Sequence, residues 1–195
     1  MTEEVGNVTE EQDPWSVSTH DLHEAIRRYR SSGTPAVIAT VVAVEGSAYR
    51  RPGAMMLIDP DEDSYGAITA GCLEGPVKQL AQEVLDDGNP VIETFDLMET
   101  DGEWGLGLGC NGIIDILLEP LDEGWDPVVT ALDQHEQIAT ATVVGSDNPS
   151  IVVGDRMAYT GDEFTAVPGR DSLPSEVTMQ LETKITEFAE NTGSG

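Results

Sequence analysis

A change of pattern within residues 66–74 constrains the fold of this chain more than any other feature. The segment runs Gly-Ala-Ile-Thr-Ala-Gly-Cys-Leu-Glu, and its apolar stretch ends at Gly71 and Cys72. From Leu73 to Leu85, apolar residues recur at spacings of three and four, which predicts an amphipathic helix directly after a strand. Cys72 is therefore predicted to lie where a strand turns into a helix.

Cys72 is the leading candidate for a reactive residue. The first backbone N–H groups of a helix have no partner within the helix and favour negative charge, so a thiol beside them loses its proton more readily. Glu74 falls in the first turn of the same helix, where the dipole stabilises a carboxylate with or without a catalytic role. The alternative for Cys72 is a buried structural thiol, since cysteine often packs as a small apolar residue.

Similar patterns along the chain predict a single α/β domain with a mixed β-sheet of about seven strands, flanked by helices. The predicted helices cover residues 18–32, 73–88, 127–134 and 175–190, and the predicted strands cover 36–44, 55–58, 65–70, 91–97, 113–118, 138–144 and 151–159. Residues 1–17 form a flexible acidic N-terminal segment in this interpretation, residues 18–190 the domain, and residues 191–195 a flexible tail.

Two pairs of segments in the chain have similar sequences, and we call this similarity the internal echo. Ala-Thr-Val-Val at residues 39–42, followed by Gly-Ala-Met-Met at 53–56, resembles Ala-Thr-Val-Val at 141–144 followed by Gly-Asp-Arg-Met at 154–157. A duplicated β-hairpin and a chance match in a β-rich chain both explain this echo. If the hairpin is duplicated, the first copy holds the function, because the second copy has neither a cysteine nor a pair of arginines in its loops.

The charge of the chain disfavours two classes of partner. It has 37 acidic and 9 basic residues, for a formal net charge of -28, and such a surface repels nucleic acid and anionic membranes. The acidic residues are spread along the chain, which is typical of a halophilic protein kept soluble at high salt. No signal peptide and no apolar run of about 20 residues is recognisable, so a cytoplasmic protein with reduced thiols is expected.

Few basic residues remain for binding. Arg27, Arg28 and Arg30 lie near the end of the first predicted helix, where they suit its dipole, and we do not interpret them as a binding patch. Arg50 and Arg51 lie in a loop instead, and arginine binds phosphate through two parallel hydrogen bonds. Gly46, Ser47 and Gly53 belong to the same loop and could assist in phosphate binding. The alternative is that Arg50 and Arg51 are surface residues that offset the negative charge of the chain.

The second cysteine, Cys110, also lies in a glycine-rich loop, Gly-Leu-Gly-Leu-Gly-Cys-Asn-Gly at residues 105–112. The two cysteines could converge as a dithiol, as ligands of a soft metal, or as a sulfur relay. None of the three histidines is well placed to activate either thiol. The fingerprints of dinucleotide and phosphate-binding loops are absent, so neither NAD nor ATP binding is predicted.

Three stretches together resemble the xanthine dehydrogenase accessory factor family, XdhC/CoxI: residues 46–56, residues 66–74, and residues 107–121. The resemblance implies a chaperone for molybdenum cofactor rather than a turnover enzyme. Such a chaperone binds the pterin cofactor, works with a cysteine desulfurase in its sulfuration, and delivers it to an apo molybdenum hydroxylase of the xanthine dehydrogenase or CO dehydrogenase type. The chain resembles the N-terminal domain of this family only, so a separate Rossmann-type nucleotide-binding protein is an expected partner.

The resemblance also implies which residues act. Cys72 and Cys110 would handle sulfur and could contact molybdenum. The implied cofactor-binding residues are Gly46, Ser47, Arg50, Arg51, Gly53, Gly71, Cys72, Glu74, Gly109, Cys110, Asn111 and Gly112. A homodimer is compatible with this role, since loops of two chains could enclose a large flat cofactor. The alternative from a different class is a thiol-dependent redox or sulfur-transfer protein that uses Cys72 and Cys110 as a reversible pair.

Overall fold

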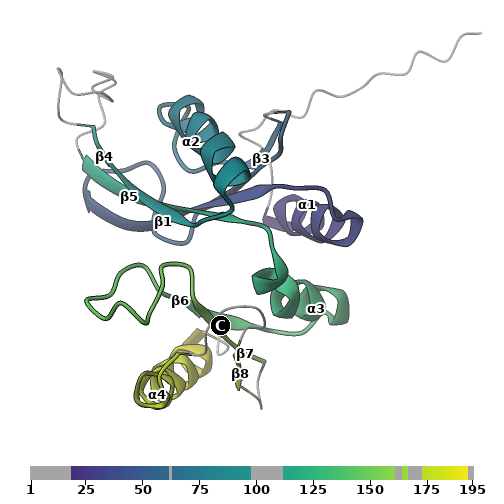
Figure 1. Cartoon of the computed structure of the whole chain (residues 1–195), viewed down its shortest axis with the longest axis vertical. Helices are drawn as coiled ribbons and strands as arrows, with labels where there is room; N and C mark the ends of the chain where they lie inside the picture. Colours follow the sequence, from purple (N-terminus) through teal and green to yellow (C-terminus); the bar gives the residue numbers. More distant parts are fainter. Residues whose placement is uncertain (1–18, 62, 98–111, 161–163, 167–172, 193–195) are drawn as a thin grey trace, which may run out of the picture.

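The structure is a computed structural model that describes residues 19–61, 63–97, 112–160, 164–166 and 173–192 (Figure 1). Its elements in chain order are α1 (Thr19–Ser32), β1 (Val37–Gly46), β2 (Met55–Ile58), β3 (Ser64–Gly66), α2 (Glu74–Asp87), β4 (Val91–Asp96), β5 (Gly112–Pro120), the 3₁₀ turn η1 (Glu123–Trp125), α3 (Asp126–Gln134), β6 (Ala139–Thr142), β7 (Arg156–Tyr159), β8 (Phe164–Ala166) and α4 (Ser175–Thr192). None of the described helices is long and apolar enough to cross a membrane.

The strands form two sheets. A five-stranded sheet has the order β3-β2-β1-β5-β4 and a three-stranded sheet the order β6-β7-β8. The predicted α/β class, with a sheet flanked by helices, is confirmed. The expectation of one mixed sheet of about seven strands is wrong: there are two sheets, and all their described strand pairs are antiparallel. The reason is that β5 lies between β1 and β4, so both its edges are filled and the chain leaves the sheet after it.

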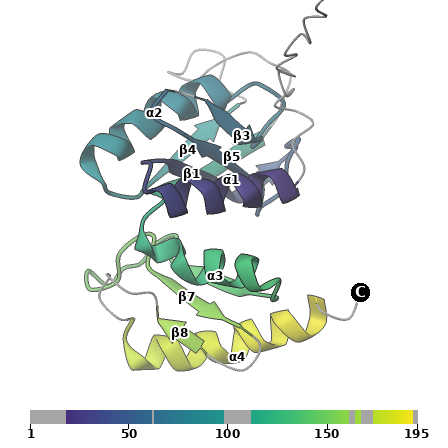
Figure 2. The same cartoon turned by 90° about the vertical axis from the view of Figure 1, so that its right-hand side faces the viewer.

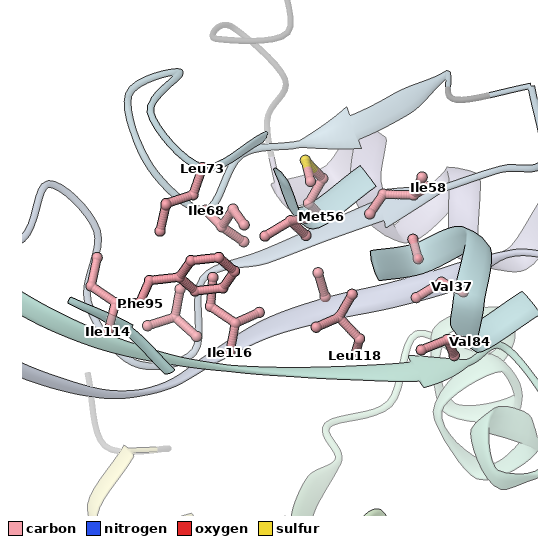
Figure 3. Close-up of a cluster of buried hydrophobic side chains, with 14 of the residues drawn as sticks. Val37, Met56, Ile58, Ile68, Leu73, Val84, Phe95, Ile114, Ile116 and Leu118 are labelled. Carbon is pink, nitrogen blue, oxygen red and sulfur yellow. The ribbon is translucent and has the colours of Figure 1, made fainter. Parts of the chain in front are cut away.

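The first sheet is covered on both faces. Val37 and Ala39 of β1 point into a core with Met56 and Phe95 beneath α2 (Figure 3). Ile38, the residue between them, joins α1 on the opposite face, because successive side chains of a strand point to opposite sides. Figure 2 shows the resulting layers in order: α2, the five-stranded sheet, α1, α3, the three-stranded sheet and α4.

Ion pairs join α1 to α3. Arg27 donates from Nε to Asp133 over 2.6 Å, and Arg30 donates from Nη2 to Asp126 over 3.1 Å. The guanidinium carbon of Arg28 lies 5.2 Å from the ring centre of Tyr29 and 5.1 Å from that of Tyr65. These arginines therefore have structural contacts, as their interpretation as structural residues requires.

The two segments of the internal echo form equivalent hairpins. In the first, Ala39 pairs with Met56, and in the second, Ala141 pairs with Met157. The order α1-β1-β2-β3-α2 also recurs as α3-β6-β7-β8-α4. Shared register and shared element order favour a duplicated unit over a chance match.

The backbone hydrogen bonds of the two hairpins agree as well. Gly53 donates to Val41 over 2.8 Å, and Gly154 donates to Val143 over 2.9 Å. Both glycines have a positive φ, +96° and +87°, a backbone conformation that residues with a Cβ rarely adopt. The same glycine therefore serves the same turn in each unit, and the echo in sequence reflects a repeated structure.

Three predicted strands are at least three residues shorter than expected. One is β6, which covers Ala139–Thr142 instead of 138–144, and local turns explain the other two. β3 ends at Gly66, because its φ of +91° leaves the extended region and a Cβ there would collide with the carbonyl oxygen of Met55. β7 begins at Arg156 rather than at residue 151, because Asp155 accepts a hydrogen bond from the backbone N–H of Val152 over 2.8 Å and holds a turn. Local turns thus replace strand in both places. β8 was not among the predicted strands.

A buried ion pair connects the two sheets. Arg156 of β7 donates from Nη2 to Glu119 of β5 over 2.5 Å, and the two side chains are only 6% and 2% exposed. Arg156 also donates from Nε to Thr142 over 3.0 Å, and its guanidinium lies 4.2 Å from the ring centre of Trp125. Because a buried charge is costly without a partner, these contacts fix the second sheet against the first.

Candidate functional site

The topology brings the two described loop segments with predicted site residues, and Gly112, to one end of the five-stranded sheet. β1 and β3 end there and β5 begins there, with Gly46 paired to Gly112. The hairpin loop of residues 47–54 and the segment of residues 67–73 leave the strands at the same end (Figure 1). We call this region, made of residues 46–54, residues 67–73 and Gly112, the loop end of the sheet.

Gly112 and the end of β1 lie in close contact. A Cβ on Gly112 would lie 2.7 Å from the carbonyl oxygen of Glu45 and 2.8 Å from that of Ser47. Only glycine fits this position without moving backbone. The structure therefore brings Gly46, Ser47 and Gly112 together, and their part in a shared site stays a prediction.

Cys110 lies outside the described residues, together with Gly109 and Asn111. Its convergence with Cys72 stays a prediction, and so does the alternative of a reversible Cys72–Cys110 pair. Within the described residues, no group of three or more His, Cys, Asp or Glu side chains could hold a metal ion.

Arg50 and Arg51 occupy the loop between β1 and β2. Arg51 is exposed, and its carbonyl oxygen accepts from Ala54 over 3.1 Å to close the turn. Arg50 is half-buried, and its Nε is buried without a hydrogen-bond partner among the described residues. Its guanidinium carbon lies 5.9 Å from the ring centre of the exposed Tyr49. A buried donor without an acceptor is unusual, and an anion bound at this position would accept a hydrogen bond from Arg50 Nε.

Cys72 lies directly before the N-terminus of α2. Leu73 occupies the N-cap position and α2 starts at Glu74, so the predicted start of the helix after Cys72 is confirmed. The strand expected directly before Cys72 is not, because β3 ends at Gly66 and residues 67–73 lie between strand and helix. Cys72 is half-buried and packs against the core beneath α2, as Val44 and Ala48 do. The neighbouring Gly71 has a φ of +101°, which favours glycine at that position.

Figure 3 shows which end of this core contains Leu73, the residue that follows Cys72. Leu73 lies near Phe95 and Ile114, whereas Val37 and Val84 lie at the opposite end. Ile114 follows closely after Gly112 on β5. Cys72 thus lies at the same end of the sheet as Gly112 and the loop of residues 47–54, which carries Arg50 and Arg51 and which we call the arginine loop.

Glu74 is bonded within its own loop. Its carboxylate accepts hydrogen bonds from the backbone N–H and the hydroxyl of Thr69, and from the backbone N–H of Leu73. Sequence reasoning missed Thr69. The recognised capping pattern places a hydroxyl residue three positions before the acidic one, and here the separation is five.

One pocket lies elsewhere. It has a volume of about 330 Å³, lies beside α3, and is lined in part by Asp126, Thr130, Gln134 and Glu136. None of the predicted site residues lines it, so it does not mark the predicted site.

Comparison with known proteins supports the resemblance seen in the sequence. The model of the XdhC and CoxI family matches residues 29–96 of this chain, which contain the arginine loop and the Cys72 segment. The family resemblance is therefore confirmed for that segment. The third stretch, residues 107–121, lies beyond the matched range.

Individual relatives agree with the family match. The chain is 40% identical over 89 residues to a probable xanthine dehydrogenase subunit of Bacillus subtilis (strain 168), covering 45% of this chain and 27% of the relative. It is 29% identical over 121 residues to the molybdenum cofactor insertion chaperone PaoD of Escherichia coli (strain K12), covering 60% of this chain and 37% of the relative.

A solved structure shares the fold. The crystal structure of a xanthine dehydrogenase from Bacillus halodurans matches with a TM-score of 0.62 and 28% sequence identity, covering 79% of this chain and 46% of that one. The chain thus spans less than half the length of each of these relatives.

Proposed function

We propose that this chain is an accessory protein that binds molybdenum cofactor and assists its insertion into a molybdenum hydroxylase. The observation that carries the proposal is the loop end of the sheet, which contains Arg50 with its buried Nε, Cys72 packed against the core, and the close-packed backbone of Gly112. The family match over residues 29–96 and the similarity to a molybdenum cofactor insertion chaperone support it.

The residues present fit the chemistry of this cargo. The cofactor is an anionic pterin with a phosphate and a dithiolene. The Arg50 guanidinium suits the phosphate, since it can donate two parallel hydrogen bonds and its buried Nε has no acceptor among the described residues. Backbone amides near glycines suit an anion without a side chain in the way. The Cys72 thiol is a soft group suited to sulfur or molybdenum chemistry.

The proposal extends to sulfuration and to partners. A cysteine desulfurase carrying a cysteine persulfide would transfer the outer sulfur to the thiolate of Cys72 or Cys110, and its own S–S bond would break to release its thiolate. Cys72 or Cys110 would then carry the sulfur as a persulfide to the cofactor. The acceptor of the loaded cofactor is an apo hydroxylase of the xanthine dehydrogenase or CO dehydrogenase type. The same proposal includes a Rossmann-type nucleotide-binding partner and a homodimer. It also locates the protein in a cytoplasm of high salt.

Replacing Arg50 is expected to weaken cofactor binding. Arg50→Ala removes a charged donor, worth about 1.5–3 kcal/mol, so we expect the dissociation constant to rise about tenfold or more. Arg50→Lys keeps the charge without the planar fork, and we expect an intermediate loss. The measurement is a fluorescence titration of the pterin at high salt.

Lys184→Ala provides the matched control, because Lys184 is an exposed cation on α4 and removing it changes the net charge by the same amount. Its dissociation constant should equal that of the wild type. If Arg50→Ala and Lys184→Ala bind equally well, Arg50 does not hold the cofactor.

A further inference from the structure

The loop that carries Cys72 is closed by a ring of hydrogen bonds. Glu74 Oε1 accepts from the backbone N–H of Thr69 over 2.9 Å, and Glu74 Oε2 accepts from the Thr69 hydroxyl over 2.5 Å. The backbone N–H of Leu73 lies 3.2 Å from both Glu74 Oε2 and Thr69 Oγ1. We call this ring, formed by Thr69, Leu73 and Glu74, the carboxylate clamp.

The clamp fixes both ends of a short exposed tip. Thr69 and Leu73 are buried at 2% and 0% exposure, whereas Ala70 and Gly71 between them are exposed. A buried hydroxyl needs a partner, and the carboxylate supplies one while it also accepts from two backbone N–H groups. Cys72 therefore lies in a loop whose two ends, Thr69 and Leu73, are held by hydrogen bonds, and its side chain packs against the core.

We propose that Thr69 and Glu74 are positioning residues that hold the Cys72 thiol at the loop end of the sheet. Glu74 acts in this proposal through the loop, where its two oxygens accept three hydrogen bonds from Thr69 and Leu73. The clamp is a feature of the chain itself, and its purpose rests on the proposed function, in which Cys72 handles sulfur or molybdenum.

A simpler role for Glu74 is general stabilisation of α2. A carboxylate in the first turn stabilises any helix through its dipole, and this effect needs no threonine. Thr69→Val separates the two roles. It keeps the charge of Glu74 at the start of α2 and removes the hydroxyl that donates to Glu74 and accepts from Leu73.

The test is the rate at which iodoacetamide alkylates Cys72 in a Cys110→Ser background. The rate is measured at a pH that ionises the thiol in every variant, so that it reports access and not ionisation. We expect Thr69→Val to raise the rate several-fold, because a released loop exposes a thiol that is now half-buried. Thr69→Ser restores the hydroxyl and should react at the wild-type rate.

Thr94→Val is the matched control, because Thr94 on β4 also donates its hydroxyl to a carboxylate, that of Asp115, over 2.7 Å. Its alkylation rate should equal that of the wild type. Should Thr69→Val not fold, Glu74→Gln offers a second test with the same expected direction. Alkylation of the folded Thr69→Val or Glu74→Gln protein at the wild-type rate would overturn the proposal.

This measurement does not depend on the cofactor. If wild-type protein retains no cofactor but Thr69→Val still raises the alkylation rate, the proposed function fails and the clamp stands. If cofactor is retained and the rate is unchanged, the clamp fails and the proposed function stands.

Discussion

Replacing Arg156 with alanine is expected to lower the free energy of unfolding by about 3–5 kcal/mol. The change leaves Glu119, which is 2% exposed, as a buried charge without its ion-pair partner. It also removes the hydrogen bond to Thr142 and the contact with the Trp125 ring. Because these contacts join β7 to β5, the loss should loosen the second sheet from the first. Urea denaturation at fixed high salt measures the effect.

Arg28→Ala is the control for this prediction. Arg28 is an exposed arginine that also lies over aromatic rings, and we expect its loss to cost less than about 1 kcal/mol. The double variant Arg156→Met with Glu119→Leu should recover most of the stability, since it removes both buried charges. Methionine is the natural choice because the first hairpin has Met55 at the equivalent position. An Arg156→Ala variant as stable as Arg28→Ala would show that the buried pair does not hold the sheets together.

Gly112→Ala is expected to damage both stability and the proposed site. Its Cβ would lie 2.7 Å from the carbonyl oxygen of Glu45 and 2.8 Å from that of Ser47, and backbone atoms cannot move aside as a flexible side chain does. Overpacking of this kind costs about 1–3 kcal/mol. Because the shift separates the start of β5 from the end of β1, cofactor binding should fall along with stability.

Gly75→Ala provides the comparison for Gly112→Ala. Gly75 lies in the first turn of α2, and a Cβ there meets nothing within 4 Å. Alanine favours helix over glycine by up to about 1 kcal/mol, so this variant should be as stable as the wild type or slightly more stable. If both variants keep full stability and equal cofactor binding, the close contact at Gly112 has no role.

The two repeated units share a scaffold and differ in their loops. Ala54 donates to the carbonyl of Arg51 over 3.1 Å, and Asp155 donates to that of Val152 over 3.0 Å. The position of Arg51 in the first unit is thus held by Val152 in the second. A scaffold that is kept while its loop residues change fits a function located in one unit only. That the first copy holds the function stays a prediction.

Local patterns were enough to predict most elements. The β-branched run at residues 36–44 and the apolar spacing from Leu73 to Leu85 correspond to β1 and α2. The position of Cys72 before the helix followed from the start of the apolar spacing at Leu73, whereas the strand expected up to residue 70 ends at Gly66. The periodicity of apolar residues predicts which face of an element is buried, and for α2 the buried residues Val77, Ala81 and Val84 belong to the predicted face.

Long-range contacts were not predictable in the same way. The split into two sheets depends on β5 pairing between β1 and β4, which no local pattern records. Glu119 and Arg156 lie 37 residues apart, and each alone resembles an ordinary surface charge. Thr69 resembles an ordinary residue of an apolar run until the carboxylate of Glu74 is seen to accept its hydroxyl. Such pairs are defined by tertiary structure.

The most decisive experiment for the proposed function is retention of molybdenum cofactor by the purified protein. Wild type and Cys72→Ala would be mixed with the cofactor at high salt and separated from unbound cofactor by gel filtration, and molybdenum and pterin would be measured in the protein fraction. We expect wild type to retain both in equal amounts and Cys72→Ala, which loses the thiol at the loop end of the sheet, to retain much less. A folded wild-type protein that retains neither would contradict the proposed function.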